Sequence, residues 1–188
     1  MNAIILPIKK EPYYKERDEH ERDEFIKSIE KLTGQNFVYV DESGCDEYYH
    51  RDHGRARRGE RIYGEISGRK YLRTNFIAGF CDNKVLAAFQ YSGTTKSDLV
   101  EGWLEAYLLP AVAENSIIFM DNASFHRKSE LLNIVEDFGH TLIFIPKYSP
   151  DLNKIETGLW ANMKNFLRNY LKDFASFSDA LIDFFRFK

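Results

Sequence analysis

The hydrophobic and polar positions of this chain follow two different periods, and the changes between them predict the order of its elements. Segments that are apolar at most successive positions predict strands, at residues 37–41, 72–81, 85–91, 117–121 and 141–145. Apolar residues that recur every three or four positions predict helices, at residues 96–112, 129–138, 150–171 and 178–185. A further segment, residues 11–32, is rich in charge and carries apolar residues at helical spacing. It predicts an amphipathic helix that is ended by Gly34.

Two of the predicted strands, residues 37–40 and 117–120, are apolar at every position. This pattern is typical of interior strands covered by helices on both sides. The short connection Asp82-Asn83-Lys84 predicts a hairpin between the second and third strands. The order of elements therefore predicts an α/β fold, a mixed sheet of ribonuclease H-like type with helices on both faces. We divide the chain into an N-terminal charged helical segment, residues 1–36, and a main domain, residues 37–188.

The composition is that of an ordinary globular protein. With 188 residues, 44% of them hydrophobic and 15% aromatic, the chain suits one domain with a substantial core and is not a disordered protein. It has no apolar run long enough to span a bilayer, and its first residues lack a signal-peptide core, so we expect a cytoplasmic protein with no membrane association. Cys45 and Cys81 are too few for a metal knuckle or a disulfide framework, and we interpret them as small buried residues.

Charge is distributed unevenly along the chain. The formal net charge is −3, yet residues 51–73 contain eight basic and three acidic residues, a local net charge of +5. Most of these basic residues fall in a predicted loop, residues 44–68, that is too long for a tight connection. A local patch of this kind can hold phosphate groups on a protein that is acidic overall. The alternative is a solvated surface loop.

Two aspartates end the two fully apolar strands. Asp41 follows residues 37–40 and Asp121 follows residues 117–120. If the strands are parallel neighbours, both carboxylates emerge at the carboxyl edge of the sheet, where ligands of open α/β sheets bind. Either aspartate alone could instead cap the turn that follows it. Because both are followed by a polar turn, we favour a shared site.

Glu156 is the third unusual acidic residue, since it interrupts the apolar stripe of a predicted helix. Its neighbours on that stripe are apolar: Leu152, Leu159, Trp160 and Met163. One alternative is a capping box, with Asn153 as the N-cap and Glu156 three residues later. We prefer a helix that starts at Ser149-Pro150, with Glu156 in the second turn and free of capping. A carboxylate on a core-facing stripe requires a counter-charge, and no lysine or arginine lies one turn away on that stripe.

A divalent metal ion is the simplest counter-charge for these carboxylates. Three carboxylates from two strands and one helix can hold two Mg²⁺ ions about 4 Å apart, with Mn²⁺ as a substitute. Such a pair activates a water or a DNA 3′-hydroxyl and stabilises the leaving oxygen in phosphodiester chemistry. The sequence therefore predicts a metal-dependent enzyme that carries out phosphodiester hydrolysis and transesterification.

Three blocks of the sequence, residues 40–44, 120–126 and 148–156, resemble the catalytic blocks of mariner-type DDE superfamily transposases. The resemblance is closest to the bacterial insertion-sequence branch, and the 34 residues between Asp121 and Glu156 fit that superfamily. It implies a ribonuclease H-like DDE catalytic domain that cuts transposon ends and joins them to target DNA. By motif match, Asp41, Asp121 and Glu156 would be the catalytic and metal-binding residues.

The resemblance also implies partners. These are double-stranded DNA, from the transposon ends and the target, a second copy of the chain in a homodimer, and a helix-turn-helix half encoded by an upstream reading frame. The chain would then be the product of the second reading frame. The candidate DNA-binding residues are basic or aromatic: Arg51, Arg55, Arg57, Arg58, Arg61, His126 and Lys147. For His126, a role as a hydrogen bonder that organises the turn is an equal alternative.

Two other functions stay open. The chain could be another ribonuclease H-like nuclease, which would hydrolyse DNA without joining it. It could also be a non-catalytic transposase remnant that acts as an inhibitor or a dimerisation partner. The intact acidic residues favour an enzyme, and the lack of a DNA-reading region favours the remnant. Asp121→Asn separates these functions, because it abolishes an enzyme's activity and leaves an inhibitor's effect intact.

Overall fold

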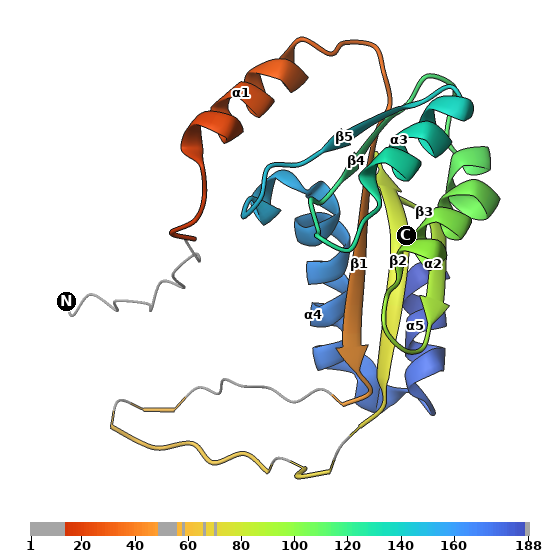
Figure 1. Cartoon of the computed structure of the whole chain (residues 1–188). Coiled ribbons are helices and arrows are strands. Elements are labelled where there is room, and N and C mark those ends of the chain that lie inside the picture. The colour runs from red at the N-terminus through yellow and green to blue at the C-terminus, as the bar shows by residue number, and fades with distance from the viewer. Residues whose placement is uncertain (1–13, 49–55, 58, 66, 70, 187–188) are drawn as a thin grey trace.

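The computed structural model describes residues 14–48, 56–57, 59–65, 67–69 and 71–186. Its centre is a five-stranded mixed sheet with the strand order β3-β2-β1-β4-β5 (Figure 1). The strands are β1 Phe37–Asp46, β2 Arg73–Cys81, β3 Lys84–Tyr91, β4 Ile117–Met120 and β5 Thr141–Phe144. β1 pairs antiparallel with β2 and parallel with β4, while β3 and β5 form the two edges.

The α-helices are α1 Glu19–Glu30, α2 Ser97–Trp103, α3 Lys128–Asp137, α4 Ala161–Tyr170 and α5 Phe177–Arg186. Shorter turns extend two of them. A π-helical turn and a 3-10 turn follow α2, at Leu104–Leu108 and Leu109–Ala111. A 3-10 turn and a π-helical turn precede α4, at Pro150–Leu152 and Glu156–Trp160, and a 3-10 turn follows it, at Leu171–Asp173. In the part of the chain that the structure describes, no helix has the length and apolar character needed to span a bilayer.

The alternation of side chains along the strands divides the core into two layers. Tyr39 and Phe119 point to one face, where α4 and α5 cover them, and their rings stack with centroids 5.1 Å apart. Val40 and Met120 point to the other face, towards α2 and α3. Every residue of β4 is buried. This confirms the prediction of interior strands with helices on both sides.

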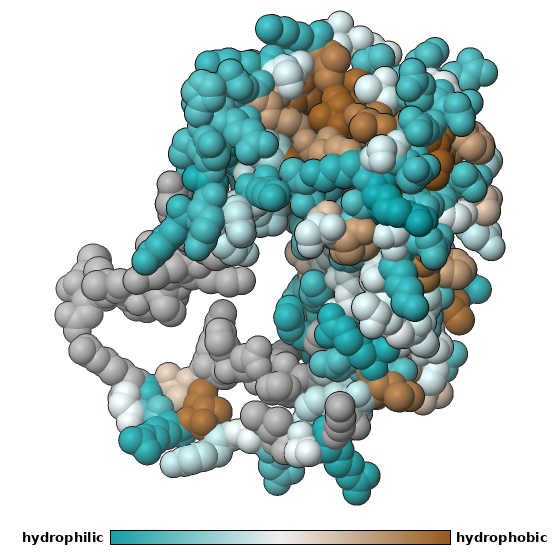
Figure 2. Space-filling model, in the orientation of Figure 1, coloured by the Kyte–Doolittle hydropathy of each residue, from teal (hydrophilic) through white to brown (hydrophobic). Residues whose placement is uncertain are grey.

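Helix α1 is shorter than the predicted helix over residues 11–32, and residues 11–13 of that range lie outside the described residues. It begins at Glu19 because the Asp18 side chain accepts hydrogen bonds from the backbone N–H groups of His20 and Glu21. Its apolar side packs on the sheet, where Phe25 meets Phe119 edge-on at 6.0 Å. Figure 2 shows hydrophobic side chains gathered between α1 and α3, while the outer side of α1 is hydrophilic.

The predicted hairpin between β2 and β3 is confirmed. Its turn consists of Asp82 and Asn83, which have φ angles of +48° and +62°. A two-residue hairpin with both residues in the left-handed region matches the twist of the strands, and Asp and Asn tolerate that conformation better than most residues.

The prediction that the first strand ends at Asp41 was wrong, since β1 continues to Asp46. Its parallel partner β4 stops at Met120, opposite Val40, but its antiparallel partner β2 continues to pair as far as Arg73, opposite Asp46. Asp41 is therefore an internal strand residue. It still lies just beyond the parallel pairing with β4, so the predicted position at the carboxyl edge of that pair is correct.

The prediction of one helix over residues 150–171 was also wrong. Ser149-Pro150 opens only a 3-10 turn, and Asn153 then takes an extended conformation (φ −89°, ψ 102°) before helical structure resumes. This break is stabilised because the Asn153 side chain donates a hydrogen bond to the Val40 carbonyl of β1, at 3.3 Å. Glu156 consequently lies in the first turn of the helix and not in its second.

Candidate active site

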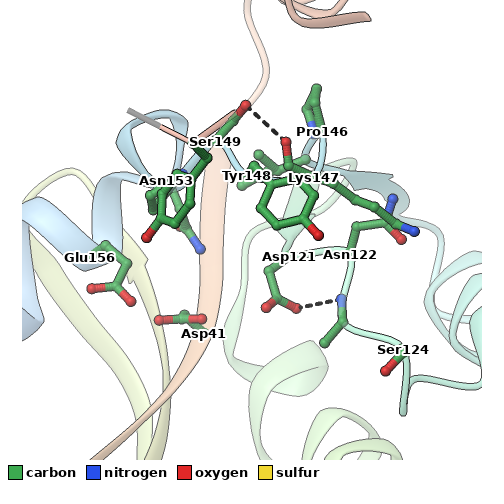
Figure 3. Close-up of a pocket in the computed structure, with 14 residues that line it drawn as sticks. Asp41, Asp121, Asn122, Ser124, Pro146, Lys147, Tyr148, Ser149, Asn153 and Glu156 are labelled. Atoms are coloured by element: carbon green, nitrogen blue, oxygen red, sulfur yellow. Dashed lines mark hydrogen bonds between the residues drawn. The ribbon is translucent and has the colours of Figure 1, made fainter. Parts of the chain in front are cut away.

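A pocket of about 440 Å³ lies at the edge of the sheet where β4 and β5 end (Figure 3). Its lining comes from the N-terminal segment, from β1, from the turn after β4, and from the segment between β5 and the helix that contains Glu156. Asp41, Asp121 and Glu156 all line it. The fold thus brings together the three acidic residues that the sequence analysis singled out from two strands and one helix.

Asp41 is the most deeply buried of the three, with 7% of its surface exposed. Its Oδ2 atom accepts a hydrogen bond from Nε1 of Trp160, at 3.0 Å. Burial raises the pKa of Asp41 well above its ordinary value, and the carboxylates of Glu156, Glu42 and Asp121 raise it further. In the absence of a cation, the site therefore favours the protonated form of Asp41.

Glu156 and Asp41 lie side by side in the pocket, with their carboxyl groups pointing toward one another (Figure 3). After burial, the charge of Glu156 is the largest effect that raises the pKa of Asp41, and a side-chain hydrogen bond between the two acts in the same direction. The π-helical turn that contains Glu156 also contains Trp160, so one local distortion of the helix aims the carboxylate and the indole N–H at the same aspartate. The capping box considered for Glu156 is not formed, since the Asn153 side-chain oxygen that would cap the helix has no hydrogen-bond partner.

Asp121 directly follows β4, and its side chain is 46% exposed. Its Oδ1 atom accepts a hydrogen bond from the backbone N–H of Ala123, at 3.2 Å, and lies 3.1 Å from Nε2 of His126. The His126 side chain is fully buried. These two contacts fix one oxygen of Asp121 and leave the other for the pocket. The position of His126 favours its interpretation as a residue that organises the turn.

Glu42 is a further acidic residue at this site, on the opposite face of β1 from Asp41. Potential ligand atoms of Glu42, Asp121 and His126 all lie within 4.8 Å of one another. Burial raises the pKa of Glu42 to about 7, although nearby His126 acts in the opposite direction. The Oε1 atom of Glu42 is buried without a hydrogen-bond partner.

The donor set of the pocket fits a divalent cation. Among the described residues, no lysine or arginine forms an ion pair with Asp41, Asp121 or Glu156. The side-chain oxygens of Asn122 and Asn153, which also line the pocket, are buried without hydrogen-bond partners. Carboxylate and amide oxygens are the ligands that hard divalent cations prefer, and a cation would offset both the burial and the carboxylate repulsion that raise the pKa of Asp41.

The predicted DNA-binding residues are distributed in three ways. Lys147 lines the pocket and is exposed, and Arg57 and Arg61 are exposed in the segment between β1 and β2. His126 is buried, as described above. The remaining three lie outside the described residues: Arg51, Arg55 and Arg58.

Sequence reasoning missed several residues of the site. Trp160 was interpreted as part of the apolar stripe, although a buried indole N–H requires an acceptor, and Asp41 is that acceptor. Glu42 was treated as part of a polar turn because the strand was expected to end before it. Tyr14 and Tyr148 line the pocket but lie far apart in the sequence, and no periodic pattern connects them.

Comparisons with known proteins agree with this geometry. A family model of DDE superfamily endonucleases matches residues 36–180. The comparison with curated proteins found no significant match.

Among solved structures, the Mos1 transposase paired-end complex with the left transposon end matches with a TM-score of 0.69 and 18% identity over 98% of this chain and 60% of that one. The Mos1 mariner paired-end complex with Mn has a TM-score of 0.70 and 17% identity, and covers 98% of this chain and 61% of that chain. The catalytic domain of Mos1 mariner transposase matches with a TM-score of 0.62 and 15% identity, and the match covers 96% of this chain and 86% of that chain. The chain thus spans about 60% of the length of the transposase chains in the paired-end complexes. These likenesses confirm the predicted fold class, an α/β ribonuclease H-like mixed sheet.

Proposed function

The chain belongs to the DDE superfamily endonucleases, and on that premise we propose that it is the catalytic part of a transposase that cuts transposon ends and joins them to target DNA. The observation that carries this proposal is the meeting of Asp41, Asp121 and Glu156 in one pocket, with no lysine or arginine paired to them among the described residues. Solved complexes of Mos1 transposase with a transposon end, and its strand transfer complex, support DNA as the substrate.

We propose that the cofactor is Mg²⁺, bound as two ions, with Mn²⁺ as a substitute. Asp41, Asp121 and Glu156 would hold it. When bound, the cations supply Lewis-acid stabilisation of the negative charge that develops on the attacking and leaving oxygens of a phosphodiester. The Mos1 paired-end complexes with Mn and with Mg support this choice of metal.

Three groups elsewhere in the chain orient the two aspartates. The Trp160 indole holds Oδ2 of Asp41, and the Ala123 N–H and His126 hold Oδ1 of Asp121. With one oxygen of each aspartate fixed, the rotation of each side chain is restricted and its second oxygen is kept towards the pocket. Lys147, at the rim, supplies a positive charge for a phosphate of the DNA backbone.

The whole transposase would include partners beyond this chain. We propose a homodimer that engages two transposon ends, and a helix-turn-helix part from an upstream reading frame that reads the terminal repeats. We further propose that the protein belongs to the bacterial insertion-sequence branch and acts in the cytoplasm. The similarity of the Mos1 paired-end complexes supports the pairing of ends.

The experiment that tests the proposal is nicking and joining of a labelled transposon-end duplex with Mg²⁺ or Mn²⁺. Wild type is compared with Glu156→Gln and with the matched control Glu105→Gln, which alters an exposed glutamate outside the pocket. Joined DNA from wild type and the control, but not from Glu156→Gln, supports the transposase. Hydrolysis without joining supports a nuclease instead. If the chain fused to the upstream DNA-reading part produces neither, the proposal is wrong.

A further inference from the structure

Two tyrosines, Tyr14 and Tyr148, stand together at the mouth of the pocket. They are far apart in the sequence, yet their ring centroids are 5.8 Å apart. Both side chains line the pocket, yet the residues remain 40% and 47% exposed. Figure 3 shows Tyr148 on the side of the pocket opposite the Asp41 and Glu156 carboxylates. The pocket therefore has carboxylates at its base and two partly exposed aromatic rings at its rim.

The backbone holds the Tyr148 ring in this position at some energetic cost. Tyr148 has a φ angle of +57°, in the left-handed region that a bulky residue rarely adopts. Strain of this kind persists where the surrounding structure requires it, and it is concentrated at binding and catalytic sites. Because Tyr148 is half exposed, its burial in the core does not account for the strain.

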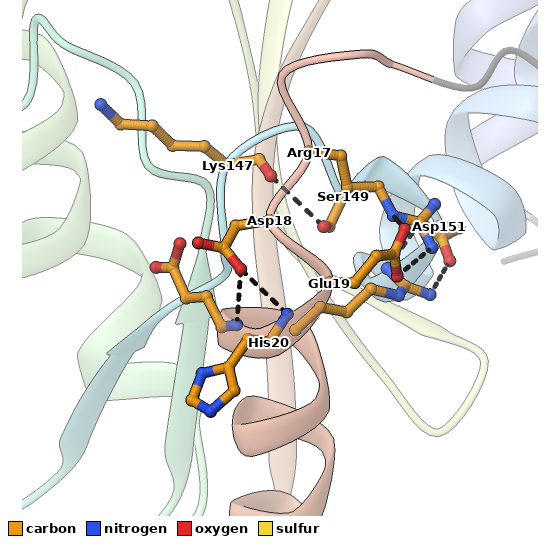
Figure 4. Close-up of polar contacts among 9 residues, drawn as sticks. Arg17, Asp18, Glu19, His20, Lys147, Ser149 and Asp151 are labelled. Atoms are coloured by element: carbon orange, nitrogen blue, oxygen red, sulfur yellow. Dashed lines mark hydrogen bonds and ion pairs between the residues drawn. The ribbon is translucent and has the colours of Figure 1, made fainter.

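Contacts near the start of α1 hold Tyr14 opposite Tyr148. The Tyr14 carbonyl accepts a hydrogen bond from the Arg17 N–H, at 3.3 Å, and forms the turn that leads into α1. Arg22 of α1 forms a two-pronged ion pair with Asp151, three residues after Tyr148 (Figure 4). The Arg22 side chain is only 12% exposed. The N-terminal segment is therefore tied to the same turn that carries Tyr148.

The size and chemistry of the pocket define what can lie between these rings and the carboxylates. A volume of about 440 Å³ is that of a small-molecule site, too small for a double helix. A phosphodiester held at the carboxylates, through the cation that they would bind, would bring its own nucleoside with it. The nucleobase is flat and apolar on its faces, and aromatic side chains are its usual platform when it leaves the base stack.

We infer that Tyr14 and Tyr148 form a stacking platform for an unpaired nucleobase next to the phosphodiester that the carboxylates hold. The inference rests on the proposed function and adds a binding site to it. The platform would keep the cleaved end of the DNA out of the double helix and aligned with the acidic residues. Stacking recognises the face that all bases share, so the platform would contribute affinity with little sequence preference.

The test measures how the full chain, in Ca²⁺, binds a short duplex with an unpaired overhang that carries 2-aminopurine. The same duplex without an overhang serves as the second DNA. We compare wild type with Tyr148→Ala and Tyr14→Ala, which remove the ring, and with the matching Phe variants, which keep it. Tyr170→Ala is the control, since Tyr170 is 52% exposed and lies outside the pocket.

We expect wild type, both Phe variants and the control to quench the 2-aminopurine fluorescence and to prefer the overhang. Each Ala variant should bind the overhang DNA roughly fivefold to a hundredfold more weakly and bind the blunt duplex unchanged. The inference is wrong if the Ala variants behave like wild type, if they lose both DNAs equally, or if wild type causes no fluorescence change. Cleavage of the same overhang DNA in Mg²⁺ separates this inference from the proposed function. If wild type cleaves that DNA while the platform test fails, the proposed function stands and only the platform is wrong.

Discussion

Glu42 provides the sharpest test of the electrostatics of this site, because its environment has a measurable effect on folding. Burial raises its pKa from the ordinary value of 4.5 to about 7. Between these two pH values, folded Glu42 keeps its proton while the unfolded chain has released it. The folded state then binds more protons, so the contribution of Glu42 to stability falls as the pH rises through this window.

The size of the effect follows from the shift. At about 1.4 kcal/mol per pKa unit, a rise from 4.5 to about 7 corresponds to a loss of about 3 kcal/mol of unfolding free energy. Glu42→Gln removes the titrating group and keeps the shape of the side chain. It also removes the Glu42 charge, which contributes to the raised pKa of Asp41. The pKa of Asp41 is then lower in the variant, which likewise makes the variant more stable at higher pH than wild type. The variant should therefore gain stability relative to wild type as the pH rises.

The assay is urea unfolding of metal-free protein at a series of values from about pH 4 to about pH 8. We expect the unfolding free energy of Glu42→Gln to rise by about 3 kcal/mol relative to wild type across this range. Glu105→Gln, at an exposed position, should show a constant difference. A constant difference for Glu42→Gln as well would refute the reasoning, because it would mean that Glu42 titrates alike in the folded and unfolded chains.

Three further predictions concern the contacts that orient the site and bind DNA. Trp160→Phe removes the hydrogen bond to Asp41 and leaves a buried acceptor without a partner, so it should lower the unfolding free energy by about 1–3 kcal/mol and slow DNA cleavage, measured by urea titration and a nicking assay. Unchanged values would contradict a role for the indole. His126→Ala should weaken Mn²⁺ binding about 10–100-fold in calorimetry, with partial recovery in His126→Gln, and equal affinities would argue against support of Asp121. Replacing three arginines of the basic segment with alanine should weaken DNA binding and reduce its salt dependence, by about one unit of slope for each lost phosphate contact. Those residues are Arg55, Arg57 and Arg58.

The fold could be predicted largely because apolar runs mark buried strands. The uninterrupted runs at residues 37–40 and 117–120 identified β1 and β4, and their pairing follows from burial on both faces. The continuation of β1 to Asp46 could not be predicted in the same way. Residues 42–46 are mostly polar or small, and their strand conformation depends on pairing with β2, which lies some 30 residues later in the sequence.

The three acidic residues could be located because each conflicts with its apolar surroundings, and that conflict is visible in sequence. Their supporting contacts could not be found in this way. The pairing of Trp160 with Asp41 spans 119 positions, and the break at Asn153 depends on a carbonyl of β1. Local propensity carries no information on such contacts. The π-helical turn Glu156–Trp160 and the break before it are therefore seen only in the structure.

The central claim is that Asp41, Asp121 and Glu156 together bind divalent cations. Calorimetric titration of the full chain with Mn²⁺ tests it without any need for DNA or a partner protein. We predict that the wild-type chain binds Mn²⁺ and that binding is lost, or greatly weakened, in each of Asp41→Asn, Asp121→Asn and Glu156→Gln, while Glu105→Gln binds like wild type. Binding that persists unchanged in all three variants of the pocket would contradict the account.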